Sequence, residues 1–300
     1  MLCHFLGGTL DVTVHEIQDD GRIKEIHKVT GGPHGGMYVN QQFESLLDEL
    51  FGTTTLQSYR EQFPSDWLCL MSEFEAKKRG KRILDSSLMT NIRLPRSFVS
   101  QIKQNKGMGI DCYGEREVKI KSNDYLSLGS GMMRKLFTPV VDNIKEHLTN
   151  LLGKPQLSKV QTMLLVGGFA ESVFLQNEIK KTFSGRCRIL VPHHASIAVA
   201  QGAVIFGKKP TTITERVMST TYGIRCTRIF KSGEHPEEKK SVIDGIVLCK
   251  DLFSCLVKEN DVVELGQRIK KVYHPSTPSS TRATVGFHVT TNPNTHYLKT

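Results

Sequence analysis

Residues 163–183 constrain the fold of this chain more than any other stretch. The apolar run Met163–Val166 ends in two glycines, Gly167 and Gly168, and an amphipathic segment follows with an apolar residue at every fourth position from 175 to 183. This order predicts a buried strand, a tight turn and a helix. Glycines at such a turn let a ligand approach the backbone, and the first N–H groups of the helix, which point outward, suit a phosphate or nucleotide. Taken alone, the pattern is more often a turn with no ligand.

The composition is that of an ordinary globular protein. Its 300 residues are 38% hydrophobic and 23% charged, enough for one large domain or two smaller ones. The net charge of +10 favours an anionic partner. No basic stripe is interleaved with aromatic residues, so we expect no specific nucleic-acid partner. No apolar run approaches the roughly 18 residues of a transmembrane helix, so we expect no membrane span.

The cysteines and histidines predict neither crosslinks nor a metal site. Seven cysteines are scattered along the chain and contain no C-x-x-C pair. This argues against a disulfide framework and a zinc site, and it predicts a reducing, cytoplasmic location. The adjacent His193 and His194 project in different directions, and no cysteine or carboxylate lies beside them, so a loop pair is the better interpretation.

The chain begins almost inside a motif. Residues 7–14 read GGTLDVTV, a glycine turn followed by an alternating strand. After Gly21, residues 23–29 can return as an antiparallel strand. A hairpin at the very start of a chain lacks its usual neighbours, which suggests a fragment. Residues 31–36 contain four glycines and one proline, which predicts a tight connection, and a helix is expected over 39–51.

A charged helical face follows. A helix is expected from Trp67 through residue 82, and it places Glu75, Lys78, Arg79 and Arg82 on one side. From this segment alone, a solvated face with internal ion pairs is the commoner interpretation. The alternative is a polar cradle, in which Glu75 accepts hydrogen bonds from a ribose and the Lys and Arg stems cover a base.

The remaining elements follow from the same patterns. Residues 83–125 look β-rich and connecting, with short strands at 92–94 and 118–120 and a basic turn at 103–109. A long helix is expected over 132–152, kinked or restarted at Pro139. A strand at 188–191 and a small-residue helix at 195–206 complete this region.

Near residue 210 the character of the chain changes. Helical periodicity ends, and glycines, prolines and threonines become frequent. Four β-prone runs can pair antiparallel, at 222–230, 241–248, 265–273 and 282–290, and residues 232–240 form a loop between them. We therefore divide the chain at 210 and expect a β-rich, truncated second region.

Taken in order, these motifs resemble the 70-kDa heat-shock chaperone family. The matching stretches are GGTLDVT at 7–13, the glycine-rich connection at 31–36, EAKKR at 75–79, LFTPVV at 136–141, LVGG at 165–168 and AVAQGA at 198–203. GGFAES at 167–172, GAVIFG at 202–207 and TYGI at 221–224 are similar to a divergent branch of that family, heat shock 70 kDa protein 12. The resemblance runs from about residue 6 to past 271.

This resemblance implies an α/β fold. Residues 1–210 would be the second lobe of an actin-like ATPase (ribonuclease H-like) domain, incomplete because the first lobe is missing. Residues 211–300 would begin a β-rich, substrate-binding-like region. The implied ligand is ATP or ADP with Mg²⁺, and a peptide or client protein is a further expected partner.

The resemblance also assigns roles to nine residues. Gly7, Gly8 and Thr9 match the second phosphate loop, which faces the β- and γ-phosphates, and Asp11 matches the acid near magnesium and its waters. Glu75, Lys78 and Arg79 match the adenosine cradle. Gly167 and Gly168 match the turn beneath the adenine and ribose. With the family match, nucleotide contact becomes the favoured interpretation of both the cradle and the turn.

Five residues depart from the family pattern. His4 stands where an acid would assist magnesium, and an imidazole cannot supply that anionic charge. Leu6 replaces a third glycine, and Phe169 replaces a small polar residue. Glu171 replaces the basic residue that covers the base in typical members, and Ser196 replaces an acid at the start of the last helix.

The family's first lobe, with its phosphate loop, lysine and most metal acids, is absent from these 300 residues. Phosphoryl transfer needs charge neutralisation from both sides, so we expect nucleotide binding to be weak or lost, hydrolysis to be impaired, and no catalytic or metal-ligating residue here. The favoured function is an ATP-binding protein of the chaperone family. The alternative is a non-enzymatic interaction protein on a degenerate actin-like scaffold. An actin-fold sugar or acetate kinase fits the motif at 75–79 less well.

Overall fold

The computed structural model describes residues 1–85, 87–104, 117–121, 124–275, 282, 284–292 and 294–298. The basic turn predicted at 103–109 lies mostly outside the described residues. Contacts between Cα atoms divide the chain into a first unit, Met1–Val12 with Thr30–Ile205, and a second unit, Thr13–Val29 with Phe206–Thr300. Residues 13–29 therefore group with the C-terminal region. The functional assignment of residues 1–210 and 211–300 stays a prediction.

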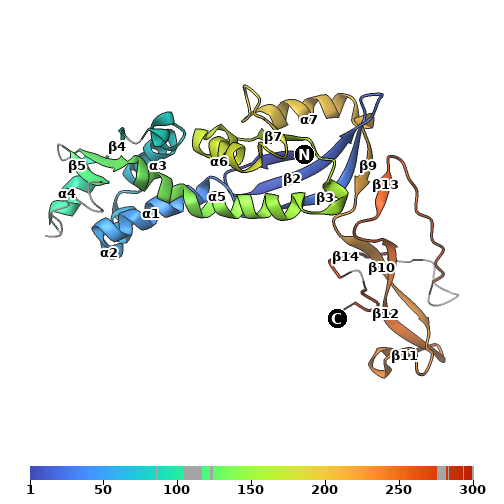
Figure 1. Ribbon diagram of the computed structural model, residues 1–300. Coiled ribbons are helices and arrows are strands. Elements are labelled where there is room, and N and C mark those ends of the chain that lie inside the picture. Colours follow the sequence, from blue (N-terminus) through green and yellow to red (C-terminus); the bar gives the residue numbers. More distant parts are fainter. Residues whose placement is uncertain are drawn as a thin grey trace. The chain divides into compact units, whose positions relative to one another are not determined.

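The first unit is a mixed α/β structure, as expected (Figure 1). Its sheet has the strand order β2-β1-β7-β8. β1 (Leu2–Phe5) pairs in parallel with β7 (Thr162–Val166), and β7 pairs in parallel with β8 (Arg188–Leu190). Parallel neighbours need crossover connections, and helices supply them here. β2 (Leu10–Ile17) and β3 (Ile23–Gly32) each pass from one unit into the other.

Seven helices of the described chain belong wholly or mainly to this unit. They are α1 (Met37–Phe51), α2 (Thr53–Gln62), α3 (Pro64–Lys78), α4 (Arg96–Gln104), α5 (Ser130–Leu152), α6 (Val173–Phe183) and α7 (Ala198–Lys208). Three short 3-10 turns are η1 (Lys81–Leu84), η2 (Pro155–Leu157) and η3 (Phe169–Glu171). A separate antiparallel sheet has the order β4-β6-β5, from β4 (Met89–Arg93), β5 (Val118–Lys121) and β6 (Tyr125–Gly129).

Apolar packing fixes α1 against its neighbours. Phe43 of α1 stacks on Phe74 of α3 with ring centroids 4.0 Å apart, and neither ring is exposed to solvent. Burial of each ring stabilises the folded state by about 1.5–3 kcal/mol. This contact brings the first turn of α1 and the last turn of α3 to the same end of the helix pair.

Several predicted elements are confirmed, with three corrections. β7, the Gly167-Gly168 turn and α6 follow in the predicted order, but η3 lies between the turn and the helix. α5 continues through Pro139 instead of restarting there. α3 ends at Lys78 rather than at 82, because Gly80 follows and its N–H bonds back to the carbonyl of Lys77.

Two helices were missed. α2 lies between two predicted helices, and α4 lies within residues 83–125, which were expected to be β-rich and connecting. α4 has only nine residues, and its short apolar pattern is too brief to separate from a strand pattern. The strand predicted at 92–94 is β4, which begins earlier, at Met89.

The second unit is β-rich, as predicted. Its strands are β9 (Ile213–Val217), β10 (Thr221–Ile229), β11 (Lys240–Ile243), β12 (Ile246–Val257), β13 (Val262–Glu264) and β14 (Phe287–Thr290), with short turns η4 (Pro210–Thr212) and η5 (Glu237–Lys239). One sheet has the order β11-β12-β10-β14, and the β2–β3 hairpin continues through β9 to β13.

The strand predicted at 241–248 is wrong, because it is a hairpin. Asp244 and Gly245 both have positive φ, +50° and +77°, and they turn the chain between β11 and β12. An Asp-Gly pair is the usual residue choice for that two-residue turn. The strand predicted at 265–273 is absent from the described residues. Of the described residues in the run at 282–290, only Phe287–Thr290 form a strand. Across the described residues, every helix is too short or too polar to span a bilayer.

Acid should destabilise the first unit through His147 on α5. Burial lowers the pKa of His147, and His34, whose ring lies 6.3 Å away, and Lys154 lower it further. The ordinary pKa is 6.5, so the unfolded chain binds this proton first as pH falls. The contribution of His147 to stability is therefore full above pH 6.5 and is lost between 6.5 and the lowered pKa.

We expect His147→Gln to flatten this slope in denaturant titrations at several pH values between 5 and 8. The exposed His193→Gln is the control. His15 in β2 also has a pKa lowered mainly by burial, so the variant must be compared with the wild type rather than with a flat baseline. An unchanged slope in His147→Gln would contradict the prediction.

A candidate ligand cavity in the first unit

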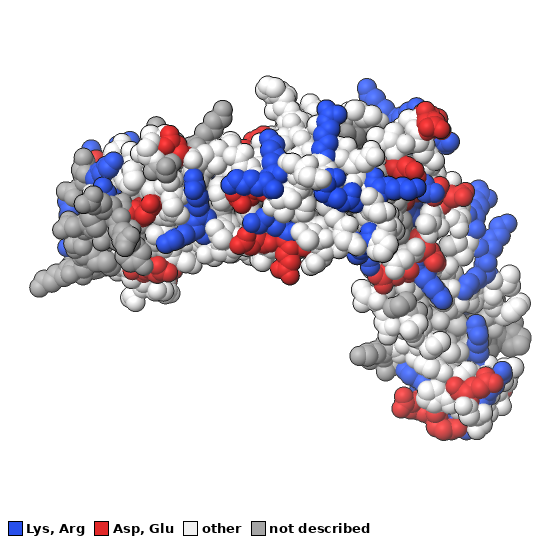
Figure 2. All heavy atoms as spheres, viewed as in Figure 1, with Lys and Arg blue, Asp and Glu red and all other residues white. Residues whose placement is uncertain are grey.

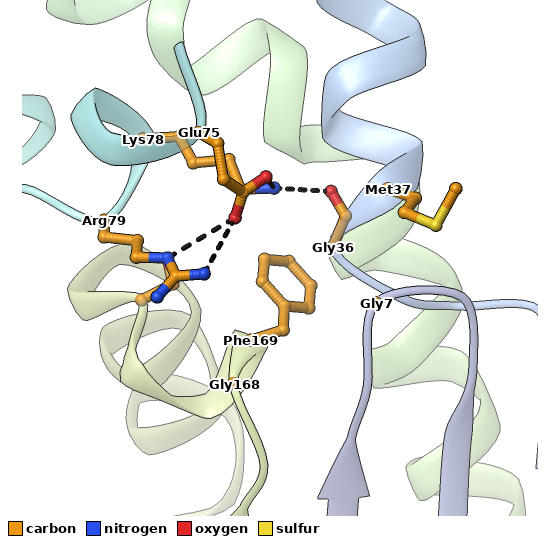
Figure 3. Close-up of a pocket in the computed structure, with 9 residues that line it drawn as sticks. Gly7, Gly36, Met37, Glu75, Lys78, Arg79, Gly168 and Phe169 are labelled. Atoms are coloured by element: carbon orange, nitrogen blue, oxygen red, sulfur yellow. Dashed lines mark hydrogen bonds and ion pairs between the residues drawn. The ribbon is translucent and has the colours of Figure 1, made fainter. Parts of the chain in front are cut away.

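A cavity of about 100 Å³ lies where four distant segments of the first unit meet (Figure 3). Its walls come from the β1–β2 turn, the start of α1, the end of α3 and the stretch that follows β7. The lining residues are Gly7, Gly36, Met37, Glu75, Lys78, Arg79, Gly168, Phe169 and Ser172. Five of these nine were predicted as site residues: Gly7, Glu75, Lys78, Arg79 and Gly168.

The β1–β2 turn supplies backbone donors. The N–H of Leu6 bonds to the carbonyl of Thr9 at 2.9 Å and closes the turn. The N–H groups of Gly7 and Gly8 have no acceptor within the described part of the chain. A Cβ on Gly8 would meet no heavy atom within 4 Å, and one on Gly7 would touch only the flexible side chain of Met37 at 3.7 Å. Neither glycine is therefore required by packing.

Of the two glycines after β7, one is required by the backbone and the other is not. Gly167 has φ +95°, and a Cβ there would lie 2.3 Å from the carbonyl oxygen of Phe5. Gly168 has φ −63°, and a Cβ there would meet nothing within 4 Å. Gly167 is thus required by the fold itself, whereas the open side of Gly168 faces the cavity.

One of the first three N–H groups of α6 is already bonded within the chain. The hydroxyl of Ser172 accepts from the N–H of Leu175 at 3.4 Å and caps the helix. The N–H groups of Ala170, Glu171 and Ser172 donate to the carbonyls of Gly167, Gly168 and Phe169. The N–H of Leu175 is therefore not available to a phosphate, whereas those of Val173 and Phe174 have no acceptor among the described residues.

The charged wall carries the predicted ion pairs. The carboxylate of Glu75 accepts from Lys78 Nζ at 2.5 Å and from an Arg79 guanidinium nitrogen at 3.1 Å (Figure 3). The two cations differ in exposure, however. The Arg79 side chain is 49% exposed, whereas Lys78 is only 4% exposed and so is not part of a solvated face.

Two pKa values reflect this arrangement. Burial raises the pKa of Glu75, but hydrogen bonds from Lys78, Asn40 and Arg79 outweigh it and leave that pKa below its ordinary value. Burial lowers the pKa of Lys78, and its pairing with Glu75 offsets this only in part. At neutral pH the carboxylate of Glu75 is therefore ionised.

Arg79 and Phe169 shape the mouth and floor of the cavity. A second guanidinium nitrogen of Arg79 lies 3.9 Å from the carboxylate of Glu171, so Arg79 stands between two acids. The ring of Phe169 is 6% exposed and stacks on Phe137 with centroids 6.2 Å apart. A Cβ on Gly36 would lie 3.1 Å from the Phe169 ring, so this glycine leaves room for it.

Four predicted site residues do not line the cavity: Gly8, Thr9, Asp11 and Gly167. Gly8 and Thr9 are exposed in the adjoining turn. Asp11 alternates with buried Leu10 and Val12 on β2, so its carboxylate lies on the opposite face of that strand. In the described ranges, no three His, Cys, Asp or Glu side chains cluster in a way that could hold a metal ion.

Sequence reasoning missed four of the lining residues as site residues, Gly36, Met37, Phe169 and Ser172, and it missed Asn40 beside them. Gly36 belongs to the segment interpreted as a plain turn, and Met37 opens the helix after it. Ser172 could have been found as the cap before an amphipathic helix. Asn40 bonds to both Glu75 and Lys78, at 3.0 and 2.9 Å, and no local pattern in the sequence marks it.

The sequence is similar to curated heat-shock proteins. It is 35% identical over 297 residues to heat shock 70 kDa protein 12A of Homo sapiens and of Mus musculus, covering 97% of this chain and 44% of those proteins. It is 35% identical over 288 residues to heat shock 70 kDa protein 12B of Homo sapiens, covering 94% of this chain and 42% of that protein. The chain thus spans less than half the length of these relatives.

The structure is similar over part of its length to two actin-like proteins. One is a non-polymerisable quadruple mutant of pCBH ParM, with 14% identity, a TM-score of 0.40, and 69% of this chain and 46% of that chain covered. The other is MreB 5 of Spiroplasma citri bound to AMPPNP, with 13% identity, a TM-score of 0.42, and 70% and 53% covered. No family model matches the sequence.

Proposed function

Because this chain is a homologue of heat shock 70 kDa proteins 12A and 12B, we propose that its first unit binds an adenine nucleotide at the cavity described above. The observation that carries the proposal is the meeting of Gly7, Glu75, Arg79 and Gly168 at one cavity. They come from segments up to 161 positions apart, and the resemblance assigns each of them to the nucleotide.

The residues that line the cavity suit different parts of a nucleotide, the phosphates at one end and the base and ribose at the other. The N–H groups of Gly7 and Gly8 suit phosphate oxygens, because they lack acceptors among the described residues. At the other end, the half-exposed guanidinium of Arg79 can cover a base. The open space above Gly168 allows the base and ribose to approach the backbone.

The size of the cavity limits what it can hold. At about 100 Å³ it is smaller than the roughly 300–1,000 Å³ of typical small-molecule sites. It accommodates part of a nucleotide, and the phosphates extend toward the exposed Gly7-Gly8 turn. Mg²⁺ would travel with the phosphates. Asp11 is the acid that the resemblance places near the metal and its waters, but it does not line the cavity, so the Mg²⁺ would be held mainly by phosphate oxygens and water.

The proposed activity of these 300 residues is binding with little hydrolysis. Glu75 is the one acid among the nine lining residues, and Lys78 and Arg79 both engage it. A carboxylate held in this way is a poor general base, because its pKa is already lowered. A chaperone role would then come from nucleotide-dependent control of the second unit.

Arg79→Met is the variant that tests this site. Its stem is kept and its charge is removed, so we expect ATP and ADP affinity to fall about tenfold in calorimetry with Mg²⁺, which is about 1.4 kcal/mol. Lys77→Met is the matched control, because Lys77 is the adjacent exposed lysine and pairs only with Glu73 among the described residues. Absence of saturable binding by the wild type would favour a non-enzymatic interaction protein instead.

A specific observation favours a second candidate function, peptide binding by the second unit. A groove of about 810 Å³ lies along β10 and residues 272–275, 282, 284 and 285. β14 pairs with β10 only as far as Ile224. Beyond it, no described strand covers this edge of β10, and an extended peptide could pair with it. The groove carries Arg225, Arg228 and Lys250. Its acid, Asp251, pairs with Lys239 and also lies 3.7 Å from Arg225, so of these three cations Arg228 and Lys250 have no ion pair among the described residues. The favoured peptide is therefore acidic.

The chain's charge is in keeping with this preference. Its formal net charge is +10, and on the face that Figure 2 shows, its Lys and Arg side chains are spread among Asp and Glu. We expect Arg228→Glu to weaken binding of a fluorescent acidic peptide about tenfold at low salt. Lys231→Glu, just beyond the end of β10, is the control. Equal affinity in both variants would rule out this groove.

A further inference from the structure

The ammonium group of Lys78 has no donor left for a ligand. Its Nζ donates to the carbonyl of Gly36 at 2.9 Å and to Oδ1 of Asn40 at 2.9 Å, and it pairs with the carboxylate of Glu75 at 2.5 Å. An ammonium group has three donors and no acceptor. At 4% exposure, Lys78 is also the most buried charge of the cavity wall.

These bonds join the last turn of α3 to the first turn of α1. Glu75 and Lys78 belong to α3, and Asn40 lies one turn into α1. The amide of Asn40 donates to the same Glu75 carboxylate at 3.0 Å, so the three side chains form a closed polar ring. Gly36, which receives the third bond, is the residue that caps α1.

From Gly36 the connection continues to the glycine turn. The N–H of Gly36 donates to the carbonyl of Leu6 at 3.1 Å, and the N–H of Met37 donates to that of Gly7 at 2.7 Å. Gly35 lies so close that a Cβ there would be 2.2 Å from the carbonyl oxygen of Gly7. A shift of Gly36 would therefore displace Leu6 and Gly7 as well.

We propose that Lys78 is a positioning residue and not a ligand contact: with Asn40 it clamps α1 to α3 and so sets the position of the Gly7-Gly8 turn. Arg79, one residue on, takes the ligand-facing role, because its guanidinium is half exposed at the cavity mouth. The hydrogen bonds of this clamp form without a bound nucleotide. Its consequence for affinity rests on the proposed function.

The first test needs no ligand. We expect Lys78→Met to increase the hydrogen-exchange rate of the Met37 amide about tenfold and to shift the amide signals of Gly7 and Gly8 in NMR spectra. Asn40→Ala removes the other half of the clamp and serves as the second variant if Lys78→Met folds poorly. Lys77→Met is the control. Exchange and shifts no different from the control, in either clamp variant, would overturn the proposal.

The second test separates the two roles by ligand. If Lys78 positions the turn, Lys78→Met weakens ATP about tenfold and leaves adenosine unchanged, because only ATP reaches the turn. If Lys78 contacted the ribose or base, adenosine and ATP would weaken equally, and the proposal would fail while nucleotide binding stood. If the wild type binds neither ligand, the proposed function fails, and the exchange measurement still decides the clamp.

Discussion

Gly167→Ala is expected to destabilise the first unit by about 3 kcal/mol or more, whereas Gly168→Ala should change stability by no more than about 0.5 kcal/mol. The cause is local. Gly167 has φ +95° and lies against the backbone of Phe5, so a methyl group there is both strained and blocked. Gly168 has ordinary φ and open space beside it.

The two variants should also separate folding from binding. Gly168→Ala places a methyl group at the cavity, so we expect ATP affinity to fall about tenfold in a protein that unfolds like the wild type. Urea titration followed by circular dichroism measures the stability, and calorimetry measures the affinity. Equal destabilisation by both variants would contradict the assigned roles of the two glycines.

Phe169→Ala is expected to destabilise the first unit by about 3 kcal/mol, the largest loss from truncating any side chain of the cavity. The ring is 6% exposed, stacks on Phe137 and fills the space left by Gly36. Its removal enlarges a cavity that is now small, so we expect the folded fraction of the variant to bind adenosine more tightly than the wild type.

The stability of Phe169→Ala is measured by urea titration, and its adenosine affinity by calorimetry at a temperature where it is folded. Phe174→Ala is a useful comparison, because that ring also packs on Phe137 but does not line the cavity. Weaker adenosine binding in Phe169→Ala would show that the ring is a stacking surface for the base rather than an obstruction.

The sequence predicted the fold best where two patterns supported each other. The apolar run before Gly167, the helical period from 175 to 183 and the alternation of residues 10–14 were each confirmed as β7, α6 and β2. The prediction was wrong where a short turn or helix lies inside a longer run with a different pattern. The Asp244-Gly245 turn splits a run interpreted as one strand, and α4 is too short for its period to be recognised.

Five of the nine residues that line the cavity were named from the sequence, but their contacts with segments distant in the sequence were not. The spacing of Glu75, Lys78 and Arg79 gave their shared face, and the resemblance brought Gly7 and Gly168 to them. Which of these residues are held by the protein depends on contacts across more than 30 positions, such as Lys78 with Asn40. Helical periodicity carries no information about such contacts, so Lys78 was assigned to the ligand.

The central claim is that the Gly7-Gly8 turn, Arg79 and Gly168 bind one nucleotide. The most direct measurement is an NMR titration of the isotope-labelled wild-type chain with Mg²⁺-ADP, followed at the backbone amides. We expect the signals of Gly7, Gly8, Arg79 and Gly168 to shift together and to saturate with a single dissociation constant. Unchanged signals at these four residues, with or without shifts elsewhere, would contradict the account.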